Sequence, residues 1–395
     1  MPAPDHVALR GYRRRAFRGA GNRASRCDAR ASLARGRLTA ASGGDRVQWR
    51  MPRVLLPALL CAALLACGGD DSTAVDASPT DAAAVDASPD SATVLDAPGD
   101  AVPTAATFTY VTSSLRVPST STEARMLGLD VDALAGDANG GIDNQLGTLL
   151  GSLRGLAPEL DLTVANATAI DRGEILLLAR LGATDPIVSG PATLTFDVGA
   201  NPVPTACATP SDAVCRRHLA GDGSFTLAPG VTPGTPLVGD VLGARFLGDG
   251  GAYVLPLTFG FGSPVVLVPV VLGASEAGAS AAGLATGKLA GAIRQTDVET
   301  ILHPALYAAF SALIDRDCPA PRTPPTCGCV AGSTGASLLS FLDIEQPRDC
   351  QGTLHELSSS FNALLTPDID TNTDGTNDAV SFGFGFTAVG ATIRP

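Results

Sequence analysis

Residues 380–393 read VSFGFGFTAVGATI and carry the clearest strand pattern in the chain. Phe382, Phe384 and Phe386 recur at every second position, with glycines between them. Successive side chains of a β-strand point to opposite faces, so this spacing predicts a strand with three aromatic rings on one face. Residues 252–261 alternate in the same way. These aromatic faces favour the core of a sheet, and a platform for stacking sugar rings is the alternative.

Outward from this stretch, strand signals are at least as frequent as helical ones, in runs of strand-forming residues bounded by Gly, Pro and polar clusters. Further strands are predicted at residues 107–117, 174–181, 192–198, 223–228, 237–247, 264–272 and 286–294. Apolar residues with helical spacing predict helices at residues 142–153, 159–170, 298–313 and 354–365. We therefore expect one globular domain at residues 105–395, mainly β with a few amphipathic helices (α+β), built as β-sandwich-like antiparallel sheets.

The charge of the chain is divided unevenly between its two parts. Residues 1–66 hold 13 Arg and 3 Asp, whereas residues 67–395 hold 14 basic and 36 acidic residues. A strongly acidic chain repels the phosphate backbone, which excludes nucleic acid as a partner of the acidic part.

An apolar run of 13 residues, VLLPALLCAALLA, follows Arg53 and ends directly before Cys67. This length is typical of the core of a signal peptide and too short to span a bilayer. Residues 51–67 resemble the lipobox signal of bacterial lipoproteins, with Leu64-Leu65-Ala66 before the cysteine. The resemblance implies cleavage before Cys67, its lipidation, and an anchor in the outer membrane of the cell envelope. An ordinary apolar helix with a chance cysteine is the alternative.

The segments on either side of this signal have biased compositions. Residues 1–50 contain 12 Arg and no apolar period, and we interpret them as a start codon placed too early, or else as a basic arm. Residues 68–104 contain eight Asp and no basic or aromatic residue, and AVDASP occurs twice in them. Such a segment cannot bury enough surface to fold, so we expect a disordered tether between the anchor and the domain.

Six of the nine cysteines fall in the expected domain. An even number of cysteines in an exported chain predicts disulfides. Cys207 and Cys215 make the easiest pair, and the other two bonds would come from Cys318, Cys327, Cys329 and Cys350. A zinc cluster around Cys327 and Cys329 is the alternative, although their single-residue spacing fits a zinc knuckle poorly.

Residues 368–378 read DIDTNTDGTND, with oxygen-bearing side chains at alternate positions followed by a glycine. This pattern resembles an EF-hand or dockerin-type calcium loop, in which a curled backbone aims its oxygens at one Ca²⁺ ion. The resemblance implies ligation by Asp370, Asn372, Asp374, the Thr376 carbonyl and Asp378. A polar turn is the alternative.

This resemblance has one departure, because Ser381 stands where the family places a bidentate acid. An earlier acidic segment, residues 128–147, shares part of the pattern. We expect Asp137 or Asp143 to supply the missing carboxylate, if the helices beside the two segments pack together.

Motifs for nucleophilic, zinc-dependent or phosphate chemistry do not occur in the sequence: there is no H-E-x-x-H, G-x-S-x-G or P-loop. We therefore expect a non-enzymatic binding or structural module that meets an envelope or extracellular partner. The alternatives are a polymer-acting hydrolase with structural calcium, and a carrier of an apolar ligand.

Overall fold

The computed structural model describes residues 105–132, 141–209 and 211–395. The expected signal peptide, Cys67, the tether and Asp137 lie outside the described residues. Those expectations stay predictions.

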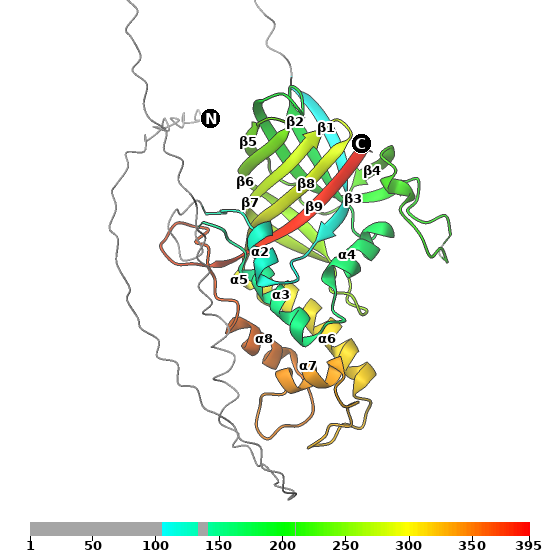
Figure 1. Ribbon diagram of the computed structural model, residues 1–395, viewed down its shortest axis with the longest axis vertical. Helices are drawn as coiled ribbons and strands as arrows, with labels where there is room; N and C mark the ends of the chain where they lie inside the picture. Colours follow the sequence, from blue (N-terminus) through cyan, green and yellow to red (C-terminus); the bar gives the residue numbers. More distant parts are fainter. Residues whose placement is uncertain (1–104, 133–140, 210) are drawn as a thin grey trace, which may run out of the picture. The chain divides into compact units, whose positions relative to one another are not determined.

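The described residues form nine strands in one sheet (Figure 1). The strands are β1 (Ala106–Arg116), β2 (Leu177–Ala183), β3 (Gly190–Val203), β4 (Gly223–Leu227), β5 (Leu237–Val241), β6 (Arg245–Leu257), β7 (Val266–Ser280), β8 (Gly283–Arg294) and β9 (Ala379–Ile393). Antiparallel pairing runs in the order β1–β2–β3–β5–β6–β7–β8–β9 and returns from β9 to β1. Eight strands therefore close the sheet on itself, and β4 pairs with β3 and, in parallel, with β9.

The closed sheet confirms the mainly β, α+β class. Opposite walls of this one closed sheet face each other. The sequence pattern predicted separate, sandwich-like sheets in this arrangement. Aromatic rings from three walls meet inside it: the ring of Phe196 on β3 lies 5.4 Å from that of Tyr253 on β6 and 5.7 Å from that of Phe386 on β9. Phe382 and Phe384 are also buried. The alternating aromatic residues therefore form a core and not a stacking platform.

The helices lie in the connections between strands. They are α2 (Ser121–Leu127), α3 (Gln145–Leu156), α4 (Leu162–Asp171), α5 (Gln295–Asp297), α6 (His303–Asp317), α7 (Thr334–Leu342) and α8 (Leu354–Asn362), with a 3₁₀ turn at Arg217–Leu219 and a π-helical turn at Val298–Leu302. Figure 1 shows α6, α7 and α8 grouped at one end of the sheet. Helices α3, α4, α6 and α8 occur where the sequence predicts helices, whereas the short α2 and α7 were not predicted.

A side chain pairs with the free backbone edge of β9 beyond the end of β1. Strand β1 ends at Arg116, opposite Gly385, so β9 has no strand neighbour on that side at Gly383. The side-chain amide of Asn144 takes this place: its Oδ1 accepts from the Gly383 N–H at 2.8 Å, and its Nδ2 donates to the Gly383 carbonyl at 2.8 Å. Asn144 therefore extends the hydrogen-bonding ladder of β9 by one residue.

The same amide also connects the two helices that cover β9. Asn144 caps α3 by accepting from the Gly147 N–H at 2.9 Å, and it donates to the Ala124 carbonyl of α2 at 2.9 Å. A Cβ at Gly383 would lie 2.7 Å from the Leu127 carbonyl oxygen, so only glycine permits this approach. All four hydrogen bonds of the Asn144 amide are buried.

We predict that Asn144→Ala lowers the free energy of unfolding by at least about 3 kcal/mol, because it leaves several buried backbone groups without partners. Urea denaturation followed by circular dichroism measures this loss. Asn362→Ala, at an exposed side chain, is the matched control and should cost under about 1 kcal/mol. Equal losses in the two variants would show that the Asn144 amide has no special role.

Candidate metal centre

Three carboxylates converge in the early acidic segment. One oxygen each from Asp130, Asp132 and Asp143 lies within 4.8 Å of the others. An isolated β-bridge between Leu129 and Asp143 brings the two ends of the segment together. Asp143 is 1% exposed, and its Oδ2 accepts from the Val131 N–H at 2.8 Å.

The late acidic segment reaches the same region through Ser381. The carboxylate of Asp368 accepts from the Ser381 N–H at 2.8 Å and from the Ser381 hydroxyl. The Ser381 hydroxyl oxygen also accepts from the Gln145 N–H at the start of α3, at 2.9 Å. Burial raises the pKa of Asp368 above its usual value, and the nearby charge of Asp132 acts in the same direction. Ser381, which stands where the EF-hand-type pattern has a bidentate acid, thus connects the two segments through its hydrogen bonds.

The loop at residues 370–376 is held by hydrogen bonds from its own backbone to its side chains. Asp370 Oδ2 accepts from the Gly375 N–H at 2.7 Å, and Gly375 has a positive φ of 89°. Asn372 Oδ1 accepts from the Asp374 N–H at 2.9 Å, and Asp374 Oδ1 accepts from the Thr376 N–H at 2.8 Å. Backbone N–H groups therefore hold these oxygens within the loop.

Asp378 closes the base of this loop. Its two carboxylate oxygens accept from the Thr371 N–H and the Thr371 hydroxyl, each at 2.8 Å. The backbone hydrogen bond from Thr371 is the main cause that lowers the pKa of Asp378. Among the described acidic side chains, Asp370, Asp374 and Asp378 do not form a convergent group of the kind that the early segment forms.

The chemistry of the early cluster fits a hard divalent cation. Carboxylates held close together repel each other when ionised, and a cation between them removes that repulsion. Ca²⁺ takes six to eight oxygen ligands, including backbone carbonyls and water, so Asp130, Asp132 and Asp143 can supply only part of its shell.

Asp143 is among the ligands that the sequence predicts, whereas Asp130 and Asp132 are not. Their signal is present in the sequence as an alternating D-x-D, residues 130–132, without a following Asx-Gly pair at the usual spacing. The Leu129–Asp143 bridge, which joins the segment's ends, is the feature that sequence alone does not provide.

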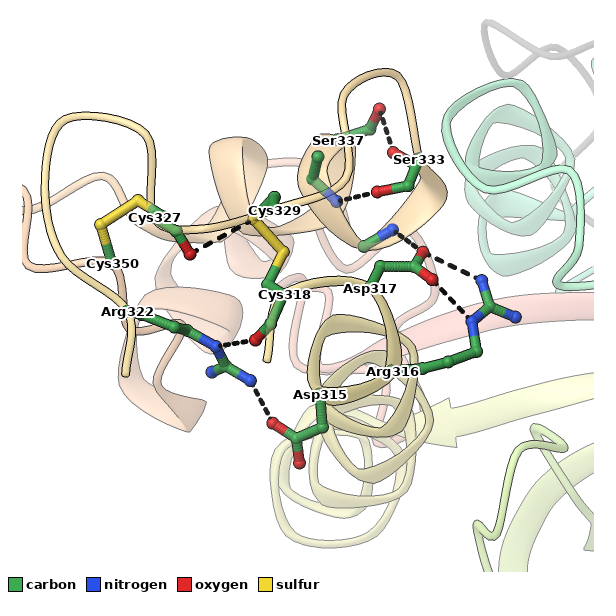
Figure 2. The surroundings of a disulfide bond; sticks show 12 residues. Asp315, Arg316, Asp317, Cys318, Arg322, Cys327, Cys329, Ser333, Ser337 and Cys350 are labelled. Atoms are coloured by element: carbon green, nitrogen blue, oxygen red, sulfur yellow. Dashed lines mark hydrogen bonds and ion pairs between the residues drawn. A yellow bond between two sulfur atoms is a disulfide. The ribbon is translucent and has the colours of Figure 1, made fainter. Parts of the chain in front are cut away.

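All six cysteines of the described residues form disulfides, as the sequence predicts. The pairs are Cys207–Cys215, Cys318–Cys329 and Cys327–Cys350. Figure 2 shows the last two pairs side by side near the end of α6, where Arg322 donates to the Cys318 carbonyl at 2.6 Å. The sulfurs that a zinc cluster would use are thus bonded to one another.

A histidine–serine pair lies between α6 and α8. His303 Nδ1 is 3.2 Å from Ser358 Oγ, and the imidazole is fully buried, with its ring 5.8 Å from that of Phe361. Its Nε2 has no hydrogen-bond partner among the described residues. A general base has to reach a substrate proton, and this imidazole is enclosed, so the pair stabilises the helix contact.

No protein-family model, curated protein or solved structure matches this chain. Among the helices of the described residues, none has the length and apolar composition needed to cross a bilayer.

We predict that the folded state loses stability as the pH falls from 7 to 5.5. Burial lowers the pKa of His218 and of His303 below the usual value near 6.5. Below that value the unfolded chain takes up protons that the folded chain does not, so the free energy of unfolding falls with decreasing pH, by up to about 1.4 kcal/mol per pH unit for each histidine.

Urea denaturation at pH 7.0, 6.0 and 5.5 measures this slope. His303→Gln should make the slope shallower, whereas His355→Gln, at an exposed position, should leave it unchanged. A wild-type stability that does not vary over this range would contradict the prediction.

Proposed function

We propose that the protein is a lipoprotein anchored in the bacterial outer membrane, and that residues 105–395 act as a non-enzymatic binding or structural module stabilised by Ca²⁺. The observation that carries the calcium proposal is the convergence of Asp130, Asp132 and Asp143 beside the N-terminus of α3. Three disulfides, which are typical of exported chains, support the export of this domain.

Calcium at this cluster would stabilise the contact between α3 and β9. Asp143 directly precedes Asn144, and Asp368 is bonded to Ser381, two residues before Gly383. A cation held by Asp143, and attracted also by Asp368, would therefore oppose separation of the helix from the strand. This placement favours a structural ion over a catalytic one.

The packed interior favours a binding module over a carrier. The ring of Phe196 contacts those of Tyr253 and Phe386 across the closed sheet, in the space that an apolar ligand would need. We expect partners to bind instead on the outer surface. The shallow groove between α4 and residues 258–263, where Val164 and Phe261 are exposed, is one such surface.

We predict that EDTA lowers the melting temperature of the purified protein by about 5 °C, because a ligand at a hundredfold excess over its Kd contributes about 2.7 kcal/mol. Asp132→Asn should remove this sensitivity to EDTA. Asp249→Asn, an exposed position on β6, is the control and should keep it. Differential scanning calorimetry with and without Ca²⁺ measures each effect.

In the same experiment, Asp374→Ala tests which of the two acidic segments binds the ion. Retained EDTA sensitivity in this variant assigns the ion to Asp130, Asp132 and Asp143, and lost sensitivity assigns a share to the 370–378 loop. A wild-type protein whose melting temperature does not respond to EDTA or to added Ca²⁺ contradicts the calcium proposal.

We predict that Cys67→Ser abolishes labelling of the protein by radioactive palmitate in a bacterial host, because the acylated sulfur is gone. Cys61→Ser, in the apolar run of the same signal, should keep the label. Equal labelling of Cys67→Ser and wild type would contradict the anchor, as would a mature N-terminus upstream of residue 67.

A further inference from the structure

The disulfide Cys327–Cys350 lies against a buried carboxylate. Cys327 is in the connection between α6 and α7, and Cys350 is in the connection between α7 and α8, so the bond ties together the two ends of α7. Asp343 is the residue that ends α7. One of its carboxylate oxygens and the two sulfurs all lie within 4.8 Å of one another.

One oxygen of this carboxylate has no hydrogen-bond donor among the described residues. Asp343 is 2% exposed, and its Oδ2 accepts from the Cys350 N–H at 3.2 Å. Its Oδ1 is buried, and no group in the described part of the chain donates to it. The carboxylate also stands at the C-terminus of α7, where the helix dipole is negative.

Reduction of the disulfide would place an S–H donor beside the Asp343 carboxylate, one oxygen of which lies within 4.8 Å of both sulfurs. A thiol of Cys327 or Cys350 carries an S–H that can donate to this carboxylate, whereas a disulfide sulfur carries no proton. The carboxylate therefore stabilises the reduced pair relative to the oxidised pair.

We propose that Cys327–Cys350 is a redox-active disulfide that exchanges with external dithiols, and that Asp343 is the proton acceptor for Cys350. A dithiol is the reductant. Its thiolate attacks the half-buried Cys327, the Cys327–Cys350 bond breaks, and Cys350 leaves as a thiolate. Asp343 passes to Cys350 the proton that the second thiol of the reductant gives up. The second thiol of the reductant then attacks the mixed disulfide and releases Cys327, so the dithiol is oxidised to a cyclic disulfide.

The reverse reaction explains the place of Asp343. Cys350 is 0% exposed, so its thiol cannot pass a proton directly to solvent when it attacks the mixed disulfide at Cys327. Asp343 accepts that proton. This step needs no calcium and is independent of the proposed function.

The other two disulfides are matched comparisons within the chain, because each also has an aspartate close in sequence. Asp317, next to Cys318, is bonded through both oxygens, at 2.7 and 2.9 Å to Arg316 and at 2.8 Å to the Gly335 N–H (Figure 2). Asp212, near Cys215, accepts from the Ala208 and Thr209 N–H groups. Neither carboxylate has a buried oxygen that lacks a donor among the described groups.

The test equilibrates the full chain, purified in detergent, with mixtures of reduced and oxidised dithiothreitol. Differential alkylation and mass spectrometry then report each cysteine separately. In the wild type, we expect Cys327–Cys350 to be half reduced at a ratio of reduced to oxidised dithiothreitol about tenfold lower than the ratio that half reduces either other disulfide. This difference is equivalent to about 1.4 kcal/mol. This ordering needs no variant. A wild type in which another disulfide is reduced first overturns the proposal.

Asp343→Asn keeps the acceptor for the Cys350 N–H and removes the carboxylate. We expect the midpoint of Cys327–Cys350 to move about tenfold towards stronger reducing conditions, with the other two midpoints unchanged. Asp349→Asn removes an exposed charge beside Cys350 and should shift the midpoint less than twofold. If the midpoint of Cys327–Cys350 shifts less than twofold in Asp343→Asn, while the circular dichroism spectrum is unchanged, Asp343 has only a structural role and its part in the proposal is overturned.

Discussion

The paired hydrogen bonds between the Asn144 amide and Gly383 are the contact on which the candidate site depends. They hold the start of α3 against β9 at the point where β1 has ended. Asp143 precedes this amide and Ser381 lies two residues before Gly383, so both acidic segments take their positions from one buried side chain. Because strand side chains alternate, a slip of one residue in β9 would move Ser381 to the inner face of the sheet.

The alternating Phe and Gly residues of β9 serve both faces of the sheet. Phe384 and Phe386 face inward and fill the interior, while Gly383 and Gly385 face outward and leave room for α2. A Cβ at Gly385 would lie 3.2 Å from the Leu127 side chain. The pattern that predicts a strand therefore also explains why helices can lie close to it.

The nine strands were predictable because each contains a run of strand-forming residues bounded by turn residues, and β6 and β9 also alternate with a period of two. The largest error lies at residues 237–261, where the chain turns at Gly243 and Ala244, both with positive φ, and β6 begins earlier than predicted. Closure of the sheet was not predictable, because it depends on pairing between Tyr110 and Gly390, and alternation is the same in open and closed sheets.

The site was predictable only in part, for a related reason. The curl of the 370–376 loop depends on local hydrogen bonds, which the spacing of its side chains encodes. The approach of Asp130 and Asp132 to Asp143 depends on a bridge between the ends of a long connection. The Cys207–Cys215 bond is local and was predicted, whereas the pairing of the other four cysteines depends on how α6, α7 and α8 pack.

One constraint connects the two proposals: a buried carboxylate needs a partner. Asp197 on β3 meets this need with Arg180, at 2.8 Å, and with the Gly234 N–H, at 3.1 Å. Asp143 has a backbone donor and lies beside two further carboxylates, and a divalent cation would reduce the repulsion among the three. Asp343 has one buried oxygen to which no described group donates, and it lies beside two sulfurs, so a thiol there could supply a hydrogen-bond donor.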